Sequence, residues 1–377
     1  MIYLDHAAAT PVSKKARLAM EPYFDAEFFN PSAAYLPARK VAAEYETAKA
    51  TIARAIGAKA TDLVITAGAT EANNLAFSAA GEGEVLYLVT EHDSVRKVAE
   101  RRGGEAIAVD RNGRILIEDL RKKISDNVSL VSVSLANNEI GTIQPLSEIA
   151  ALIREVRFDR LSRGVRQTLY LHSDASQAMN LLDINVARLG VDLLTLNAAK
   201  VYGPKGVGAL YVSHEVKLSP ATVGGGQEKG LRAGTENVPS VIGFAAAISN
   251  AKEHIGGNRK KYAKWRQILL ANLQGYELVN KKHTLDNFVV LCYNGLDAER
   301  LIFLLEERGI LVSTGAACAA SKGAKSHVLS AIGLSDAEIS GSLRITLGET
   351  NDEEQILEAA RAINEVVEGE RRRINEW

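Results

Sequence analysis

Apolar residues recur along the first part of the chain in two alternating patterns. Short, nearly continuous apolar runs alternate with longer segments in which apolar residues have helical spacing. The predicted strands are residues 62–66, 84–89, 105–110, 128–137, 167–175 and 192–199. The clearest predicted helices are residues 38–57, 69–80 and 145–158. Such alternation favours βαβ units and a mostly parallel sheet sandwiched by helices.

The pattern changes near residue 250, which suggests a second unit. Residues 243–254 and 262–276 are predicted as separate long helices, followed by strands at 285–296 and 341–348 and a helix at the C-terminus. We therefore expect an α/β protein with a large domain and a smaller α+β domain. The predicted large domain is residues 13–250, and the smaller one combines residues 1–12 and 251–377.

Composition and charge narrow the classes of partner. Of 377 residues, 46% are hydrophobic, and 45 basic against 46 acidic residues give a formal net charge of -1. No global field would attract nucleic acid or an anionic membrane, so a small molecule or a protein is the expected partner. The chain has no apolar run of membrane-spanning length, no signal-peptide pattern at its start and only two cysteines. These features predict a cytoplasmic protein with reduced thiols.

Polar side chains and glycines gather where the predicted strands end, which is where α/β proteins bind ligands. In "TAGATEANN", Ala69 and Thr70 would open a helix and offer an anion site, although an ordinary helix cap explains the same residues. His92 follows the next strand and could stack on a planar ligand or carry protons, although a structural histidine is the commoner case. Asn138 and Asp174 follow two further strands.

Lysine, glycine and arginine residues add to this set. The stretch "LTLNAAKVYGPKGVGALYV" holds Lys200 and Lys205 beside a Gly-Pro turn. The glycine-rich segment "GGGQEKGLRAGTEN" carries Thr235 but fits no Rossmann or Walker spacing. Arg344 lies in an apolar predicted strand, where its planar guanidinium is suited to a carboxylate.

The two cysteines have different surroundings. Cys318 lies among small residues, with lysines following, so its thiol is a candidate nucleophile. Cys292 lies inside an apolar strand and is predicted to be a buried packing residue. Together, an anion site, an imidazole, an acid, a lysine, a thiol and a carboxylate clamp match the needs of pyridoxal phosphate chemistry. No metal site is predicted.

In order and spelling, these motifs resemble those of the cysteine desulfurases of the NifS/IscS group, within the fold-type I (class V aminotransferase) pyridoxal phosphate enzymes. The likeness runs almost from end to end, through "YLDHAAATPV", "FNPSA", "GATEANN", "TEHDSV", "ANNEIGTIQP", "SDASQ", "KVYGPKGVGALYV", "GGGQEKGLRAGTENVPS", "STGAAC" and "SLRITLGETN". The resemblance implies conversion of L-cysteine to L-alanine, with the sulfur transferred to Cys318 as a persulfide. An acceptor in iron–sulfur cluster assembly or tRNA thiolation would then receive it.

The resemblance also implies a role for each site residue. Lys200, and not Lys205, matches the lysine that binds pyridoxal 5'-phosphate as a Schiff base. His92 matches the catalytic histidine that stacks on the cofactor ring, and Arg344 matches the substrate-carboxylate clamp, with Asn138 near the substrate. The remaining matches to cofactor-binding residues are Ala69, Thr70, Asn138, Asp174, Gln177, Asn197 and, reaching the other subunit of a homodimer, Thr235.

Two residues depart from the family pattern. Where the family usually reads Ser-x-His-Lys, this chain has Asn197 and Ala199 in place of the serine and histidine. The amide of Asn197 can still donate, whereas Ala199 has no side-chain donor, so we expect looser cofactor retention. Tyr35 stands where the family tends to carry a histidine near the substrate entrance. The alternatives are a related lyase or transaminase, such as a selenocysteine lyase, or a low-activity scaffold.

Overall fold

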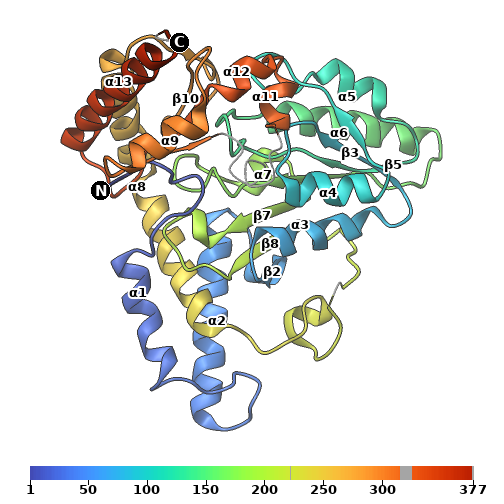
Figure 1. Cartoon of the computed structure of the whole chain (residues 1–377). Helices are drawn as coiled ribbons and strands as arrows, with labels where there is room; N and C mark the ends of the chain where they lie inside the picture. Colours follow the sequence, from blue (N-terminus) through green and yellow to red (C-terminus); the bar gives the residue numbers. More distant parts are fainter. Residues whose placement is uncertain (221, 315–324, 376–377) are drawn as a thin grey trace.

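The structure is a computed structural model that describes residues 1–220, 222–314 and 325–375 (Figure 1). Cys318, the predicted persulfide residue, lies outside the described residues. None of the helices within these ranges is long and apolar enough to cross a membrane.

A seven-stranded sheet forms the centre of the larger part, in the order β2-β8-β7-β6-β5-β3-β4. Every strand pair is parallel except the two that β8 makes with β2 and β7. The mostly parallel sheet expected from the sequence is therefore confirmed. The strands are β2 (Leu63–Thr66), β3 (Glu84–Leu88), β4 (Glu105–Ile107), β5 (Val128–Ser132), β6 (Tyr170–Asp174), β7 (Leu193–Asn197) and β8 (Gly208–Val212).

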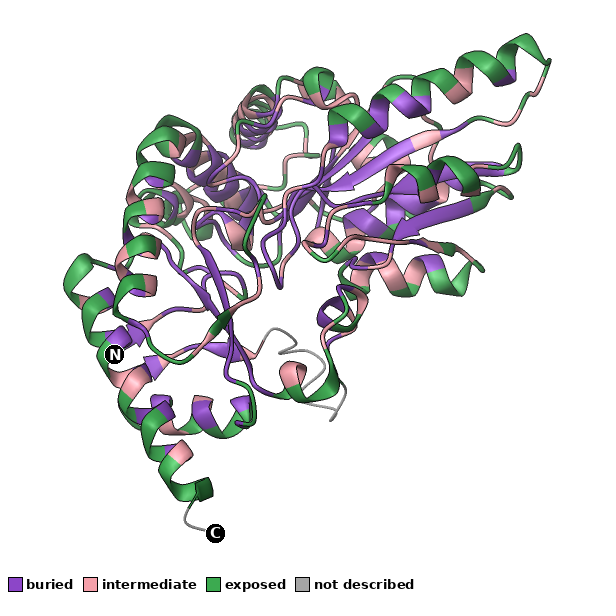
Figure 2. Cartoon of the chain, turned by 90° about the horizontal axis from the view of Figure 1, so that it is seen from above, coloured by how far each residue is buried: buried purple, intermediate pink, exposed green. Residues whose placement is uncertain are grey.

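Both faces of this sheet are buried under helices. On β3, Leu86 belongs to one apolar cluster and Val85 to another, because neighbouring strand residues point to opposite faces. Figure 2 shows the strands almost wholly buried and the outward sides of the helices exposed. The helices of this part are α1 (Lys14–Met20), α2 (Leu36–Ala55), α3 (Ala69–Phe77), α4 (Asp93–Arg101), α5 (Ile117–Lys123), α6 (Leu146–Ser162) and α7 (Val186–Leu189). Its short 3-10 turns are η1 (Glu21–Phe24), η2 (Ala60–Asp62), η3 (Ser78–Ala80), η4 (Ala198–Lys200) and η5 (Gln227–Gly230).

One long helix, α8 (Val238–Asn272), runs through the position where the sequence suggested a domain boundary. Residues 243–254 and 262–272 are helical as predicted, but they belong to one continuous helix rather than to two. Gly256 and Gly257 lie inside α8, and each costs about 1 kcal/mol of helix stability relative to alanine. Helices α1, α2 and α13 (Glu353–Asn375) pack against α8 and outweigh that cost. The division at residue 250 stays a prediction, and α8 is shared by both parts.

The smaller part is an antiparallel sheet with helices, as expected. Its order is β12-β13-β10-β9, and β1 pairs in parallel with β11 beside it. This pairing brings the N-terminal residues into the C-terminal part. The strands are β1 (Ile2–Tyr3), β9 (Glu277–Leu278), β10 (Phe288–Cys292), β11 (Ile310–Leu311), β12 (Ser313–Thr314) and β13 (Ser342–Thr346), and the helices are α9 (Ala298–Glu306), α11 (His327–Ala331), α12 (Asp336–Ser340) and α13. Cys292 is 3% exposed on β10, which confirms the predicted packing role.

Candidate active site

A cavity of about 480 Å³ opens at the carboxyl ends of the parallel strands and is lined by residues of both parts. The predicted site residues that line it are Ala69, Thr70, His92, Asn138, Asp174, Gln177, Asn197, Lys200 and Arg344. Thr235 is exposed and is not among the lining residues. Tyr35 is also absent from the lining, with 54% of its surface exposed. The fold thus brings together nearly all of the residues singled out from strand ends.

Lys200 ends η4, directly after β7, and its amine lies under the N-terminal segment. Its Nζ donates to the carbonyl oxygens of Ala7 at 2.7 Å and Ala8 at 2.5 Å. Asn180 fixes the backbone by donating from Nδ2 to the Lys200 carbonyl at 2.7 Å. Lys205 does not line the cavity, and its Nζ donates to the carbonyl of Thr10 at 3.3 Å.

Asp174 is the last residue of β6 and is 8% exposed. Its Oδ2 accepts from Asn73 Nδ2 at 2.9 Å, and its Oδ1 accepts from the backbone N–H of Ser176 at 2.9 Å. Two fixed donors thus hold a carboxylate at the cavity wall. A carboxylate that already has two donors is suited to face a cationic group.

His92 is the N-cap residue of α4, and its Nδ1 accepts from the backbone N–H of Ser94 at 3.1 Å. His92 is exposed where it lines the cavity, and the surrounding protein groups partly desolvate its ring. This desolvation is the main cause that lowers the pKa of His92, and Lys200 acts in the same direction. The carboxylates of Asp174 and Asp93 oppose the shift.

The first turn of α3 lies close to β8, and glycine makes this approach feasible. A Cβ on Gly208 would lie 2.8 Å from the Gly68 backbone. Beyond this turn, Arg232 forms an ion pair with Glu71 at 3.1 Å, so its charge is already matched. Asn197 Oδ1 accepts from the Ala199 N–H at 3.2 Å, which leaves the Asn197 amide group as the available donor.

Arg344 lies on β13 and is 4% exposed. Its Nη2 pairs with Asp5 Oδ1 at 2.7 Å, and its Nη1 donates to the backbone carbonyl of Asn138 at 2.8 Å. Its Nε has no hydrogen-bond partner among the described residues. Arg344 therefore joins the N-terminal segment to the cavity wall while keeping unused donors.

Two buried carboxyl groups in the wall were missed at the sequence level. Burial raises the pKa of Glu91 to about 8, with Asp174 adding to the rise, and burial raises the pKa of Glu139 to about 7. Glu91 accepts from the Ser134 backbone N–H, and Glu139 accepts from the Ser326 hydroxyl. The sequence did offer a sign of both groups: Glu91 directly precedes His92 in "TEHD", and Glu139 directly follows Asn138 in "ANNEIG".

We expect Glu91 to make stability fall as pH rises. Its folded pKa of about 8 lies above the ordinary value of 4.5, so between these values the folded protein holds a proton that the unfolded chain releases. The free energy of unfolding therefore falls as pH rises through this window and levels off above it. Glu91→Gln should flatten the dependence in urea titrations at pH 5.5 and 8, whereas the exposed Glu82→Gln should not. An unchanged slope in Glu91→Gln would contradict this assignment.

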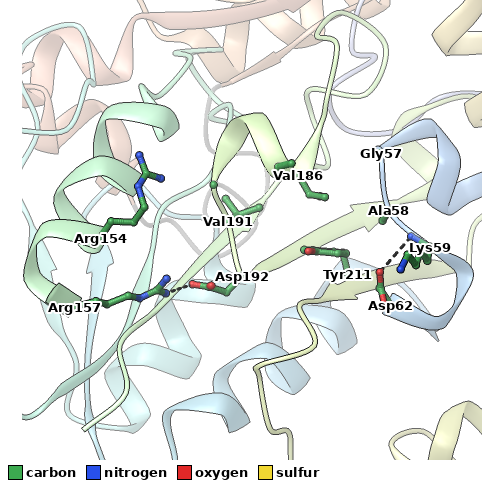
Figure 3. Close-up of a pocket in the computed structure, with 12 residues that line it drawn as sticks. Gly57, Ala58, Lys59, Asp62, Arg154, Arg157, Val186, Val191, Asp192 and Tyr211 are labelled. Atoms are coloured by element: carbon green, nitrogen blue, oxygen red, sulfur yellow. Dashed lines mark hydrogen bonds and ion pairs between the residues drawn. The ribbon is translucent and has the colours of Figure 1, made fainter. Parts of the chain in front are cut away.

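A second hollow, of about 370 Å³, lies at the opposite edge of the sheet (Figure 3). Arg157 pairs with Asp192 on one side of it, and Tyr211, Lys59 and Arg154 also line it. None of the predicted site residues that the structure describes lines this second hollow. The chemistry-bearing residues are therefore gathered at the carboxyl ends of the strands.

A lysine, an imidazole, a held carboxylate and an arginine around a cavity at the carboxyl ends of parallel strands define an α/β enzyme site. The sequence model described as "Aminotransferase class-V" matches residues 2–358. The chain belongs to the class-V aminotransferase family.

The chain is also similar to individual proteins over nearly its whole length. It is 36% identical to "Cysteine desulfurase IscS 1" of Archaeoglobus fulgidus, covering 94% of each chain. It is 36% identical to "Cysteine desulfurase IscS" of Dictyoglomus turgidum, covering 92% of this chain and 89% of that one. Among solved structures, a NifS-like protein from Rickettsia africae superposes with a TM-score of 0.87 at 30% identity, covering 98% of this chain and 99% of that one.

Proposed function

We propose that this protein is a pyridoxal phosphate-dependent cysteine desulfurase that converts L-cysteine to L-alanine and carries the sulfur as a persulfide on Cys318. The observation that carries the proposal is one cavity in which Lys200, Asp174, His92 and Arg344 converge, in a chain of this family. A related solved structure is described as "SspA in complex with cysteine"; it is 32% identical with a TM-score of 0.79, and the match covers 92% of this chain and 99% of that one.

The donor set of the cavity fits pyridoxal 5'-phosphate. Lys200 would hold the cofactor through its amine, and the Asp174 carboxylate would face the pyridine nitrogen. The phosphate would be held at the first turn of α3, where helix N–H groups favour an anion. The remaining residues that would hold the cofactor are Ala69, Thr70, Asn138, Gln177, Asn197 and, from the other subunit, Thr235. When bound, the cofactor supplies an acceptor for electrons released at the substrate's α-carbon.

The chain's own residues would then bind substrate and move protons. Arg344 would bind the substrate carboxylate through its unused donors, beside Asn138. Lys200 would accept and return protons as a neutral amine. Cys318 would attack the substrate sulfur, so that one S–S bond forms and one C–S bond breaks. The electron pair of the C–S bond would stay on the carbon skeleton, which takes up a proton and leaves as L-alanine.

Two exposed apolar segments support a homodimer. The first segment joins α1 to α2: Phe28 lies before α2 and is 67% exposed, and Leu36 is the first residue of α2 and is 77% exposed. The second is the glycine-rich segment before α8, in which Val223 is 82% exposed. Both segments project from the body in Figure 1, and Thr235 lies in the second. Phe24 and Tyr35 in the first segment are exposed as well, and exposed apolar side chains gathered on one segment favour an interface with another chain. A second copy would place Thr235 at the neighbouring site.

The persulfide would pass to an acceptor protein, an iron–sulfur scaffold or a tRNA-thiolation carrier, in the cytoplasm. The Cys318 sulfur distinguishes this reaction from that of a lyase or transaminase, which does not need it. The near balance of charge gives no support for nucleic acid as partner.

The decisive experiment compares wild type with Cys318→Ser. We expect L-alanine formation from L-cysteine to fall by roughly two orders of magnitude, because the hydroxyl is a much weaker nucleophile than a thiolate. Cys292→Ala, which removes the buried cysteine of β10, should keep most of the activity. Full L-alanine formation in Cys318→Ser would rule out the desulfurase and favour a lyase or transaminase.

Ala199 leads to a separate prediction about cofactor retention. The Ala199 backbone accepts from the Thr10 N–H and hydroxyl, and its side chain offers no donor. Ala199→His should tighten the Kd for pyridoxal phosphate by about ten- to a hundredfold, the value of one charge-assisted hydrogen bond. Absorbance titration of the apoprotein measures this, with Ala198→Gly as the neighbouring control. A Kd that does not tighten would show that the site is already complete without a histidine.

A further inference from the structure

A chain of hydrogen bonds connects the acid of β6 to the imidazole at the start of α4. Asn73, on α3, is fully buried, and its Nδ2 lies 2.9 Å from Asp174 Oδ2 and 2.8 Å from Ser94 Oγ. Ser94 Oγ in turn lies 2.9 Å from His92 Nδ1. Asn73 and Ser94 thus link two groups of the cavity that lie on different elements.

The direction of each hydrogen bond between Asp174 and His92 follows from the Asp174 carboxylate. A carboxylate only accepts, so the Asn73 group that faces Asp174 is its NH₂. The opposite group, Asn73 Oδ1, has no hydrogen-bond partner in the described residues. The NH₂ has two hydrogens, one for Asp174 and one for Ser94 Oγ. Because Ser94 Oγ accepts from Asn73, its own hydrogen is directed to His92 Nδ1.

His92 Nδ1 therefore receives two donors, the Ser94 hydroxyl and the Ser94 backbone N–H at 3.1 Å. A ring nitrogen that accepts two hydrogen bonds carries no proton, so the proton of the neutral ring lies on Nε2. A proton on Nδ1 would break both of these hydrogen bonds. It would also face the Ser94 backbone N–H, which cannot turn to accept it.

The charges around the ring act in both directions. Asp174 on β6 and Asp93 on α4 favour the imidazolium, whereas Lys200 on η4 disfavours it. His327 on α11 lies close enough to interact electrostatically with His92. Desolvation outweighs the carboxylates, so the pKa of His92 is lowered and the ring is neutral at neutral pH.

We propose that Asn73 and Ser94 are positioning residues that hold His92 as the Nε2–H tautomer. Nε2–H is then the donor that the ring offers to a molecule in the cavity, and proton uptake at Nδ1 requires loss of the Ser94 contacts. The tautomer does not depend on the proposed function, but its role in catalysis does. In a desulfurase, His92 would donate a hydrogen bond to the substrate, and Lys200 would be the group that accepts protons.

The test is nitrogen-15 NMR of the full chain labelled at its seven histidines, with and without pyridoxal phosphate. His92→Gln assigns the signal. In wild type we expect an unprotonated Nδ1 and a protonated Nε2 above the pKa of His92. Ser94→Ala removes the shorter of the two contacts to Nδ1 and keeps only the 3.1 Å backbone donor, so the preference for Nε2–H should weaken, giving a mixture of tautomers, and the pKa of His92 should rise. Asn73→Leu should give the same mixture and weaken the Kd for pyridoxal phosphate by about tenfold, since Asp174 loses a donor.

Asn74→Ala is the matched control. Asn74 is the exposed neighbour of Asn73, and its amide donates to the Thr70 backbone carbonyl. Its His92 spectrum should match wild type. A wild-type ring protonated on Nδ1, or a single Nε2–H tautomer retained in both Ser94→Ala and Asn73→Leu, would overturn the proposal. The ring spectrum is read without turnover, so a protein that lacks desulfurase activity would still test it.

Discussion

Lys200→Ala is expected to lower L-alanine formation from L-cysteine by roughly 10⁴-fold, the scale of loss when a covalent and proton-transferring group is removed. Lys200 is the amine at the carboxyl end of β7 that lines the cavity together with Asp174 and His92. The visible absorption band of the bound cofactor should also disappear, because the amine that would form the Schiff base is lost.

Lys205→Ala is the matched control for this loss. Its side chain is exposed, belongs to the same Gly-Pro segment and donates to the Thr10 carbonyl. Its absorption spectrum and L-alanine formation should stay near those of wild type. Full activity in Lys200→Ala, or an equal loss in Lys205→Ala, would contradict the assignment of the two lysines.

Three of the cavity residues that the sequence predicted share one property, their position at the end of an apolar strand. Asp174, Asn197 and His92 each follow such a run, and parallel strands bring their carboxyl ends to one edge. The strands themselves were predictable because both faces of the sheet are apolar. The position of a residue relative to its predicted strand was therefore enough to find these side chains from the sequence.

Residues that act through a contact between distant elements could not be found in this way. Asn73 looks like an ordinary helical residue, and its importance comes from lying between Asp174 and Ser94. The Asp5 partner of Arg344 is separated from it by nearly the whole chain. Likewise, Gly256 and Gly257 disfavour a helix that tertiary packing keeps continuous. Propensity and spacing carry no information on such contacts.

Glu228 provides the largest stability effect that we expect in this protein. Its carboxylate pairs with Lys49 of α2 at 2.9 Å, and the two side chains are only 5% and 8% exposed. It also accepts from the Tyr45 hydroxyl at 2.6 Å and from the Ile65 N–H of β2 at 2.9 Å. Glu228→Ala leaves Lys49 buried without its partner, so the free energy of unfolding should fall by about 3–5 kcal/mol in urea titrations.

Backbone strain at this position acts in the opposite direction and can be separated from the charge. Glu228 and Lys229 have positive φ angles of 47° and 60°, so the glycine-rich loop turns here at a cost that the buried pair offsets. Glu228→Gly also lacks the ion pair with Lys49, but it relieves the backbone strain. Its free energy of unfolding should therefore be only about 1 kcal/mol higher than that of Glu228→Ala. Lys229→Ala, at an exposed residue with a similar φ, should cost about 1 kcal/mol or less.

A double variant completes the test. Combining Lys49→Met with Glu228→Leu replaces the buried pair by apolar side chains and should restore much of the stability, because no unpaired charge remains. The loop that Glu228 anchors also carries Thr235, which is proposed to reach the neighbouring subunit, so Glu228→Ala should weaken cofactor retention as well as folding. A loss of stability in Glu228→Ala no larger than that in Lys229→Ala would mean that the pair is not what fixes this loop on α2 and β2.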